Sequence, residues 1–223
     1  RYLKSDEDML SSFINAQVSN PGDIKRINYI SSYDTMVLND LVSYDYKHNE
    51  ENNEGNRDGE NYNYSWNCGA EGPSRKKHIN SLRLKQAKNI LIMLMSARGI
   101  PMLYAGDEFF NTQGGNNNPY CQDNKISWVI WKDTAYSAEL LSFVKELIAF
   151  RRRHPIVHMC HEPRLMDSLS CGYPDLSYHS EQAWYPKLYN HIRHIGMMFC
   201  GLYAKRDDGT DDDFIYIAYN MHW

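Results

Sequence analysis

Cysteine is scarce in this 223-residue sequence, and no two cysteines have the CxxC spacing of a metal or redox motif. The five that occur are scattered along the chain, at Cys68, Cys121, Cys160, Cys171 and Cys200. An odd and scattered set does not form the disulfide framework of a small secreted domain. We therefore expect reduced thiols and a cytoplasmic protein.

Long hydrophobic runs and signal-peptide features are also absent. The longest apolar stretch, around residues 90–95, is far too short to span a bilayer, so we expect no membrane partner. The chain also has no excess of positive charge, with 24 lysine and arginine residues against 28 aspartate and glutamate residues. The net charge is −4, and the dense basic run 151–154 lies where a predicted helix ends and cations complement the helix dipole. We therefore expect no nucleic-acid partner.

Aromatic residues, by contrast, are plentiful: they make up 13% of the chain and include 17 tyrosines and 5 tryptophans. Tyrosine and tryptophan stack well on flat apolar faces such as sugar rings or bases. The same residues equally suit a large core with a polar rim, and a chain that is 42% hydrophobic can form such a core. Composition leaves both interpretations open.

Strands and helices are predicted to alternate over the first two-thirds of the chain. The pattern predicts helices at residues 5–18, 74–98 (ended by Gly99) and 137–153 (capped by Ser137), and buried strands at 26–32 and 100–109. Each strand is followed by a long polar loop, at 45–73 and 111–124. Alternating βα units indicate an α/β fold with a parallel sheet, and long loops after the strands are typical of the catalytic face of a (β/α)8 barrel.

Two strands cannot close a barrel of eight, and the chain opens without methionine. We therefore expect residues 1–157 to be part of a barrel, within a longer polypeptide. Residues 158–223 have a different character. The stretch "DFIYIAYN" has the alternating pattern of a β-strand. It follows the hairpin-turn sequence "KRDDGTDDD", which is built on Asp208 and Gly209. This tail predicts the beginning of a separate antiparallel β domain.

The candidate site residues follow the two predicted strands. Asp34 lies at the C-terminal end of the first, where a carboxylate could stabilise an oxocarbenium-like transition state, hold sugar hydroxyls, or only form a turn. Asp107 and Glu108 end the second strand, and a structural role is favoured for them. The second loop offers neutral donors and acceptors beside an aromatic ring, a set that suits sugar hydroxyls or merely tolerates unusual backbone angles: Asn116, Asn117, Asn118, Tyr120, Gln122, Asp123 and Asn124.

Metal and cofactor sites are not expected. Glu54, Asn56, Asp58 and Gly59 approximate a calcium loop, but Ser65 stands where an EF-hand requires its bidentate glutamate. His191 and His194 are three residues apart without an evident third ligand.

Four long stretches of the chain resemble one enzyme group collinearly: "NYISSYDTMVLNDLVSYDYKHNEENNEGNRDG", "NYSWNCGAEG", "GIPMLYAGDEF" and "GNNNPYCQDNKISWVIW". The chain is similar, over roughly residues 5–157, to the glycogen debranching enzyme and isoamylase group of the α-amylase superfamily of glycoside hydrolases. The tail resembles the lead-in to that family's C-terminal β-sandwich.

This resemblance implies a TIM barrel that cleaves α-1,6 branch linkages of glycogen-like α-glucans by a retaining mechanism. The family's nucleophilic aspartate and acid/base glutamate follow its fourth and fifth strands. Since this chain would begin near the sixth helix and contain strands seven and eight, both would lie upstream, and the chain alone is expected to be inactive. Asp34 matches the third essential carboxylate, a transition-state stabiliser. Asn116, Asn117, Asn118, Tyr120 and Asp123 match a loop that borders the substrate cleft.

One position departs from the family pattern. A histidine precedes the essential aspartate in the family, whereas this chain has Tyr33, which can donate a hydrogen bond and stack but cannot carry an imidazolium charge. Three hypotheses follow: part of a debranching hydrolase, a weakened or non-catalytic glucan-binding relative, or an unrelated α/β segment that binds a protein through its polar loops. If strands seven and eight lack their neighbours, we also expect exposed apolar surface and self-association.

Overall fold

A computed structural model describes residues 1–19, 26–131 and 134–222. The chain forms two compact units: unit 1 comprises residues 1–28, 95–100 and 148–223, and unit 2 comprises residues 29–94 and 101–147. Two long helices pass from unit 2 into unit 1, so the units do not follow the predicted division at residues 157 and 158. That domain boundary remains a prediction.

The described elements follow the predicted order, with shorter bounds except for the helix predicted at 137–153, which begins two residues earlier. The helices are α1 (Leu10–Val18), α2 (Leu38–Leu41), α3 (Lys77–Ser96) and α4 (Ala135–Arg153). Six short 3-10 helices accompany them, at Tyr2–Lys4, Glu50–Asn52, Asp107–Phe109, Pro119–Cys121, Pro155–His158 and Gly201–Tyr203. The strands are β1 (Ile27–Tyr29), β2 (Ile100–Met102), β3 (Leu176–His179), β4 (His194–Phe199) and β5 (Ile215–Asn220).

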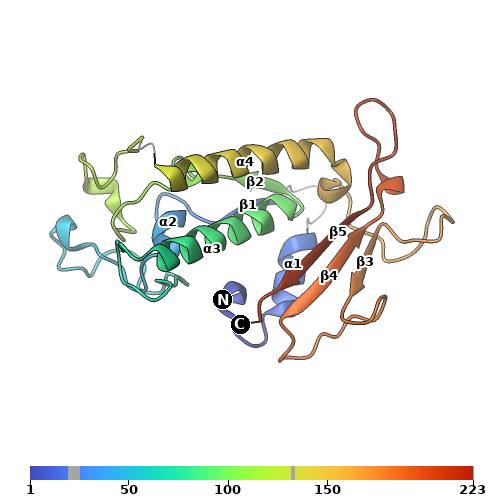
Figure 1. The fold of residues 1–223 in the computed structure, drawn as a ribbon, viewed down its shortest axis with the longest axis horizontal. Coiled ribbons are helices and arrows are strands. Elements are labelled where there is room, and N and C mark those ends of the chain that lie inside the picture. Colours follow the sequence, from blue (N-terminus) through green and yellow to red (C-terminus); the bar gives the residue numbers. More distant parts are fainter. Residues whose placement is uncertain (20–25, 132–133, 223) are drawn as a thin grey trace. The chain divides into compact units, whose positions relative to one another are not determined.

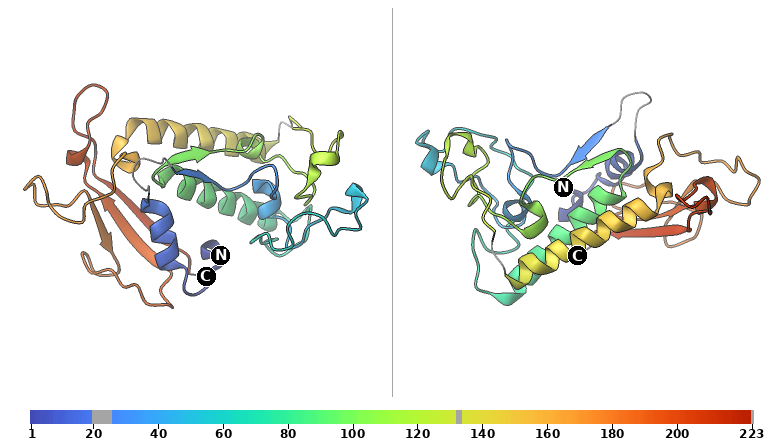
Figure 2. Two further views of the ribbon diagram at one scale, coloured as in Figure 1. Left: turned by 180° about the vertical axis from the view of Figure 1, so that it is seen from behind. Right: turned by 90° about the horizontal axis from the view of Figure 1, so that it is seen from above.

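Unit 2 is built on α3 and α4, which run side by side (Figures 1 and 2) and are joined by an ion pair of 2.6 Å between Lys88 Nζ and Glu139 Oε1. Thr134, rather than the predicted Ser137, caps α4. The Ser137 N–H donates to Thr134 Oγ1 at 3.1 Å, and the Thr134 N–H donates to Ser137 Oγ at 2.9 Å. The serine thus supplies the reciprocal half of the cap. Buried side chains of α2, α3 and α4 fill the core of unit 2: Leu38, Ile79, Leu84, Ala87, Leu91, Leu94, Leu140 and Val144.

Gly99 ends α3 as predicted, because the chain must adopt a left-handed conformation and approach another backbone segment there. Its φ is +93°, and a Cβ at this position would lie 2.5 Å from the Arg26 carbonyl oxygen. The same oxygen accepts a hydrogen bond of 2.8 Å from the Ile100 N–H. A side chain here would push apart the segments that lead into β1 and β2.

Strands β1 and β2 pair in a two-stranded sheet, and α3 lies between them in the chain. The prediction that these strands are buried is wrong. Each strand has three residues, and Ile27, Tyr29, Ile100 and Met102 are between 37% and 56% exposed. The described residues supply no further strand for this sheet, so its apolar side chains remain open to solvent. This agrees with the expectation of exposed apolar surface on these strands.

Unit 1 contains the predicted antiparallel sheet, in the order β3-β4-β5, with Leu176 opposite Phe199 and Ile195 opposite Tyr219. Helix α1 packs on this sheet (Figure 1): the Phe13 ring meets the Tyr219 ring edge-on at 4.8 Å. The hairpin between residues 205 and 211 turns at Gly209, whose φ is +83°, as predicted. The described part of unit 1 holds this one sheet, so the second sheet of a sandwich remains a prediction.

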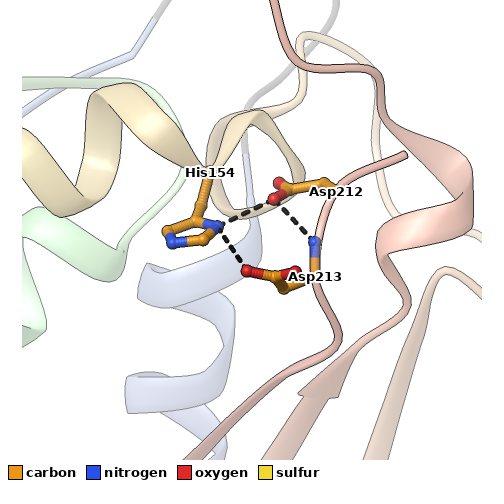
Figure 3. Close-up of side chains that lie close together, drawn as sticks. All are labelled: His154, Asp212 and Asp213. Carbon is orange, nitrogen blue, oxygen red and sulfur yellow. Dashed lines mark hydrogen bonds and ion pairs between the residues drawn. The ribbon is translucent and has the colours of Figure 1, made fainter. Parts of the chain in front are cut away.

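Buried hydrogen bonds to Asp212 fasten this hairpin to the end of α4 (Figure 3). His154 Nδ1 lies 2.7 Å from Asp212 Oδ1, and the Ile156 N–H donates to Asp212 Oδ2 at 3.0 Å. Burial alone would raise the pKa of Asp212. The hydrogen bonds from Ile156 and His154 outweigh it and hold that pKa below its usual range. The charged carboxylate thus has partners for both of its oxygens.

All five thiols are free, as expected from their spacing. Within residues 1–19, 26–131 and 134–222, none of the helices combines the length and apolar character that crossing a bilayer requires.

We expect Asp212→Asn to lower the free energy of unfolding by about 3 kcal/mol, because it leaves His154 without its buried anionic partner. Urea denaturation followed by circular dichroism measures the change. Asp211→Asn is the matched control, since Asp211 is exposed and pairs only with Lys205 at the surface. Equal unfolding midpoints for the two variants would contradict the anchoring role of Asp212.

Candidate functional site

Tyr33 and Asp34 lie on a turn between β1 and α2, in unit 2. The Tyr33 side chain is 74% exposed, and Asp34 is exposed beside it. The Ser32 hydroxyl donates a hydrogen bond to Asp34, and the Ser32 N–H donates to Thr35 Oγ1 at 2.9 Å. The structure therefore presents the predicted catalytic carboxylate to solvent on a turn with its own internal hydrogen bonds.

A second, buried carboxylate holds both ends of this turn. Asp107 is 2% exposed, and it accepts hydrogen bonds from the Ser31 hydroxyl and, at 2.8 Å, from the Leu38 N–H. Burial is the largest influence on Asp107 and raises its pKa to about 6, although these hydrogen bonds lower it. The structural role favoured for Asp107 is confirmed, and its consequence is that the segment carrying Asp34 is fixed from both sides.

Asp40 performs a similar task for the second polar loop, and sequence reasoning missed it. Its buried carboxylate accepts hydrogen bonds from the N–H groups of Gln113 and Gly115, at 2.9 and 3.0 Å, and from the Thr112 hydroxyl. Burial raises the pKa of Asp40 to about 6. An acid inside the apolar run "VLNDLV" was the available signal, because a buried carboxylate needs such partners.

The two long polar loops are joined by reciprocal amide pairs. Asn49 and Asn117 exchange hydrogen bonds of 2.9 and 3.1 Å, and Asn52 and Asn116 exchange bonds of 2.8 and 3.3 Å. Asn116 and Asn117 are 1% and 0% exposed. The structure thus places these two predicted cleft residues inside a loop-to-loop network. The partners Asn49 and Asn52 were missed, although "HNEENNEGNRDG" is as rich in asparagine as "GGNNN".

Asp58 and Gly59 complete this network. Asp58 Oδ2 accepts hydrogen bonds from the amides of Asn52, at 2.8 Å, and Asn118, at 3.0 Å. Burial opposes the charge of Asp58, but these donors hold its pKa below the usual range. Gly59 has a φ of +69°, and a Cβ there would overlap the Asn117 and Asn49 side chains. The loop therefore needs glycine at position 59, where the backbone lies close to these two side chains, as well as polar residues.

Tyr120 and Asp123 lie on the outer part of the second loop. Tyr120 belongs to the 3-10 helix Pro119–Cys121 and is 78% exposed. Asp123 is exposed and accepts a hydrogen bond of 3.0 Å from the Trp128 indole N–H. Nothing in the described hydrogen bonding links either residue to Asp34. The structure thus brings Asn116, Asn117 and Asn118 together with the first loop and leaves Tyr33, Asp34, Tyr120 and Asp123 as exposed side chains.

One group of side chains in the described residues has the composition of a metal site: His154, Asp212 and Asp213 of unit 1 (Figure 3). Arg206 already provides a cation for it, because its guanidinium pairs with Asp212 at 3.3 Å and also with Asp213. This arrangement is an ion-pair cluster, and we assign no metal to it.

No protein-family model matches the chain. Curated proteins match more than half of it. Residues of this chain are 48% identical over 130 positions to the glycogen operon protein GlgX homolog of Mycobacterium tuberculosis, a match that covers 58% of this chain and 18% of the relative. They are also 46% identical over 127 positions to isoamylase 1, chloroplastic, of Arabidopsis thaliana, covering 56% and 16%. Over more than half of its length, this chain is similar to glycogen debranching enzymes and isoamylases.

The resemblance inferred from the sequence motifs is thereby confirmed. A third relative, the glycogen debranching enzyme of Erwinia tasmaniensis, is 46% identical over 129 positions and covers 58% of this chain and 19% of its own length. The chain therefore spans about a fifth of the curated relatives that it matches.

Solved structures extend the likeness in fold to almost the whole chain. A pullulanase from Bacillus acidopullulyticus matches 97% of this chain and 21% of its own, with a TM-score of 0.59 and 16% identity. A pullulanase from Paenibacillus barengoltzii, in complex with maltohexaose and α-cyclodextrin, matches 99% of this chain and 28% of its own, with a TM-score of 0.59 and 17% identity. At such identities the likeness shows the fold alone.

The exposed Asp34 and the buried Asp107 should respond differently to the same substitution. We expect Asp107→Asn to lower the free energy of unfolding by about 2 kcal/mol, because it weakens the hydrogen bonds to Ser31 and Leu38. Asp34→Asn should leave the unfolding midpoint unchanged, since its carboxylate is open to solvent. Chemical denaturation of both variants measures this. A larger loss in Asp34→Asn than in Asp107→Asn would contradict these assignments.

Proposed function

We propose that this chain forms part of a glycoside hydrolase that cleaves α-1,6 branch linkages of glycogen-like α-glucans by a retaining mechanism. The single observation that carries the proposal is the presentation of Asp34. Its carboxylate is exposed on a turn that buried Asp107 holds at both ends, in a chain related to glycogen debranching enzymes and isoamylases. A carboxylate held in this way can stabilise an oxocarbenium-like transition state without reorganising.

The proposed architecture assigns β1 and β2 to strands seven and eight of a (β/α)8 barrel. Residues 1–157 would be the last part of that barrel, and residues 158–223 the first part of a β-sandwich. The exposed apolar side chains of β1 and β2 support this, because neighbouring strands would cover them. In their absence these side chains provide a surface for self-association. The reduced thiols suit a cytoplasmic setting.

Substrate contacts are proposed for the exposed residues of the two loops. Tyr33 and Tyr120 can stack on sugar rings, and Asp34 and Asp123 can accept hydrogen bonds from hydroxyls. Asn116 and Asn117 would support the site indirectly, because their amides hold the two loops together. Asn118, which is partly exposed, borders the same surface. The partner is an α-glucan, and no cofactor or metal takes part.

The tyrosine at position 33 favours a second candidate: a weakened or non-catalytic glucan-binding relative. Stacking and hydrogen bonding by Tyr33 would retain glucan binding. A neutral phenol would stabilise a negatively charged group in the site less than a cationic imidazole does. The two candidates differ in turnover rather than in affinity.

Asp34→Asn in the complete enzyme is expected to lower kcat on a branched glucan about 100-fold or more, with little change in KM, because the carboxylate acts mainly in the transition state. Release of reducing sugar measures both constants. The 223-residue chain alone should release none, since a nucleophile and an acid/base are supplied elsewhere. An unchanged kcat would remove Asp34 from the catalytic residues, and sugar release by the chain alone would contradict the proposed division of roles.

Tyr33→His in the complete enzyme distinguishes the two candidates. If Tyr33 weakens an otherwise competent hydrolase, the histidine should raise kcat about fivefold, the effect of one charge-assisted hydrogen bond replacing a neutral one. Tyr33→Phe is the matched control, because it keeps the ring and removes only the hydroxyl. A loss of activity in Tyr33→His would instead show that tyrosine is adapted to the preferred substrate.

A further inference from the structure

Unit 2 contains a cavity of about 620 Å³ that the proposed function does not use. It lies between the N-terminal part of α3, the segment after the 3-10 helix Asp107–Phe109, and the residues that lead into α4. Tyr33, Asp34, Tyr120 and Asp123 are not among the residues that line it. A cavity of this size accommodates a small ligand of one or two sugar rings.

A buried arginine forms part of the cavity wall. Arg83 is 4% exposed, and its Nη2 donates to the carbonyl oxygens of Asn67 at 3.1 Å, Ser43 at 3.4 Å and Ala70. Its Nε is buried and has no hydrogen-bond partner among the described residues. No ion pair in the described part of the chain includes Arg83. A buried guanidinium that lacks an anionic partner is costly, and an anion bound in the cavity would offset that cost.

The rest of the wall has the character of a site for an anionic sugar. Lys125 adds a second cation at the exposed rim, and no aspartate or glutamate of residues 1–19, 26–131 and 134–222 lines the cavity. Tyr44, Phe109 and Tyr136 provide aromatic surface, and Asn80 and Asn111 provide amides. Aromatic faces suit sugar rings, amides suit hydroxyls, and the two cations suit a phosphate.

We propose that this cavity binds a sugar phosphate ester, with the phosphate facing the Arg83 guanidinium and Lys125 and the sugar ring against the aromatic side chains. The phosphate would supply the anion that Arg83 lacks. A neutral sugar would supply the hydroxyls but not the charge. Nucleic acid is disfavoured by the net charge of −4, and among the described residues only these two cations line the cavity.

Isothermal titration calorimetry on the protein tests this proposal with glucose 6-phosphate, inorganic phosphate and glucose as separate probes. Glucose 6-phosphate should bind more tightly than either inorganic phosphate or glucose. Equal affinity for inorganic phosphate would overturn the sugar contact, and equal affinity for glucose would overturn the anion contact. A phosphate-bearing glucan dextrin distinguishes the source of the ester: tighter binding of the dextrin than of glucose 6-phosphate would assign the site to a chain-borne phosphate. Absence of binding for both esters would overturn the proposal.

Substitutions locate the binding in this cavity. Lys125→Ala should weaken binding of glucose 6-phosphate up to about fivefold, and Arg83→Lys about tenfold or more, because lysine cannot reproduce the planar guanidinium. Lys85→Ala is the matched control, since Lys85 is exposed on α3 and does not line the cavity. Circular dichroism verifies that Arg83→Lys is folded. If it is not folded, the affinities of Lys125→Ala and Lys85→Ala for glucose 6-phosphate are compared instead. Equal affinities in those two variants would overturn the assignment.

Discussion

The buried carboxylate of Asp107 is the interaction on which the candidate site depends. It lies just after β2 and accepts hydrogen bonds from Ser31 and Leu38, at the two ends of the segment after β1. Without these bonds the Tyr33–Asp34 turn would rest on its local hydrogen bonds alone. Burying the carboxylate costs free energy, as its raised pKa records. In return, an exposed catalytic candidate is held in one position.

The two polar loops are likewise held in place by buried polar side chains, most of them neutral. Asn49 pairs with Asn117 and Asn52 with Asn116, while Asp40 accepts two backbone N–H groups of the second loop. Long loops without secondary structure lose much conformational entropy on folding. Reciprocal amide pairs offset part of that loss because each satisfies a donor and an acceptor on both loops. Tyr120 and Asp123 remain exposed, as the proposed substrate contacts require.

Local sequence signals located most elements and left their ends and partners open. Gly99 and the apolar face of α3 predicted that helix closely, and Asp208-Gly209 predicted the hairpin turn. Strand burial was predicted wrongly, because burial depends on neighbours that the strand sequences themselves do not carry. Asp40 was missed because its partners at residues 112–115 are more than seventy positions away.

The sequence by itself determined the similarity to glycogen debranching enzymes and isoamylases, since motifs such as "GNNNPYCQDN" can be compared independently of how the chain folds. It also led to the prediction that Tyr33 stands where that family has a histidine. Only the tertiary structure decided which polar residues face solvent and which hold the loops together. The physical reason is that an asparagine side chain serves equally well for a sugar hydroxyl or for another amide, and only the distance to a partner separates the two uses.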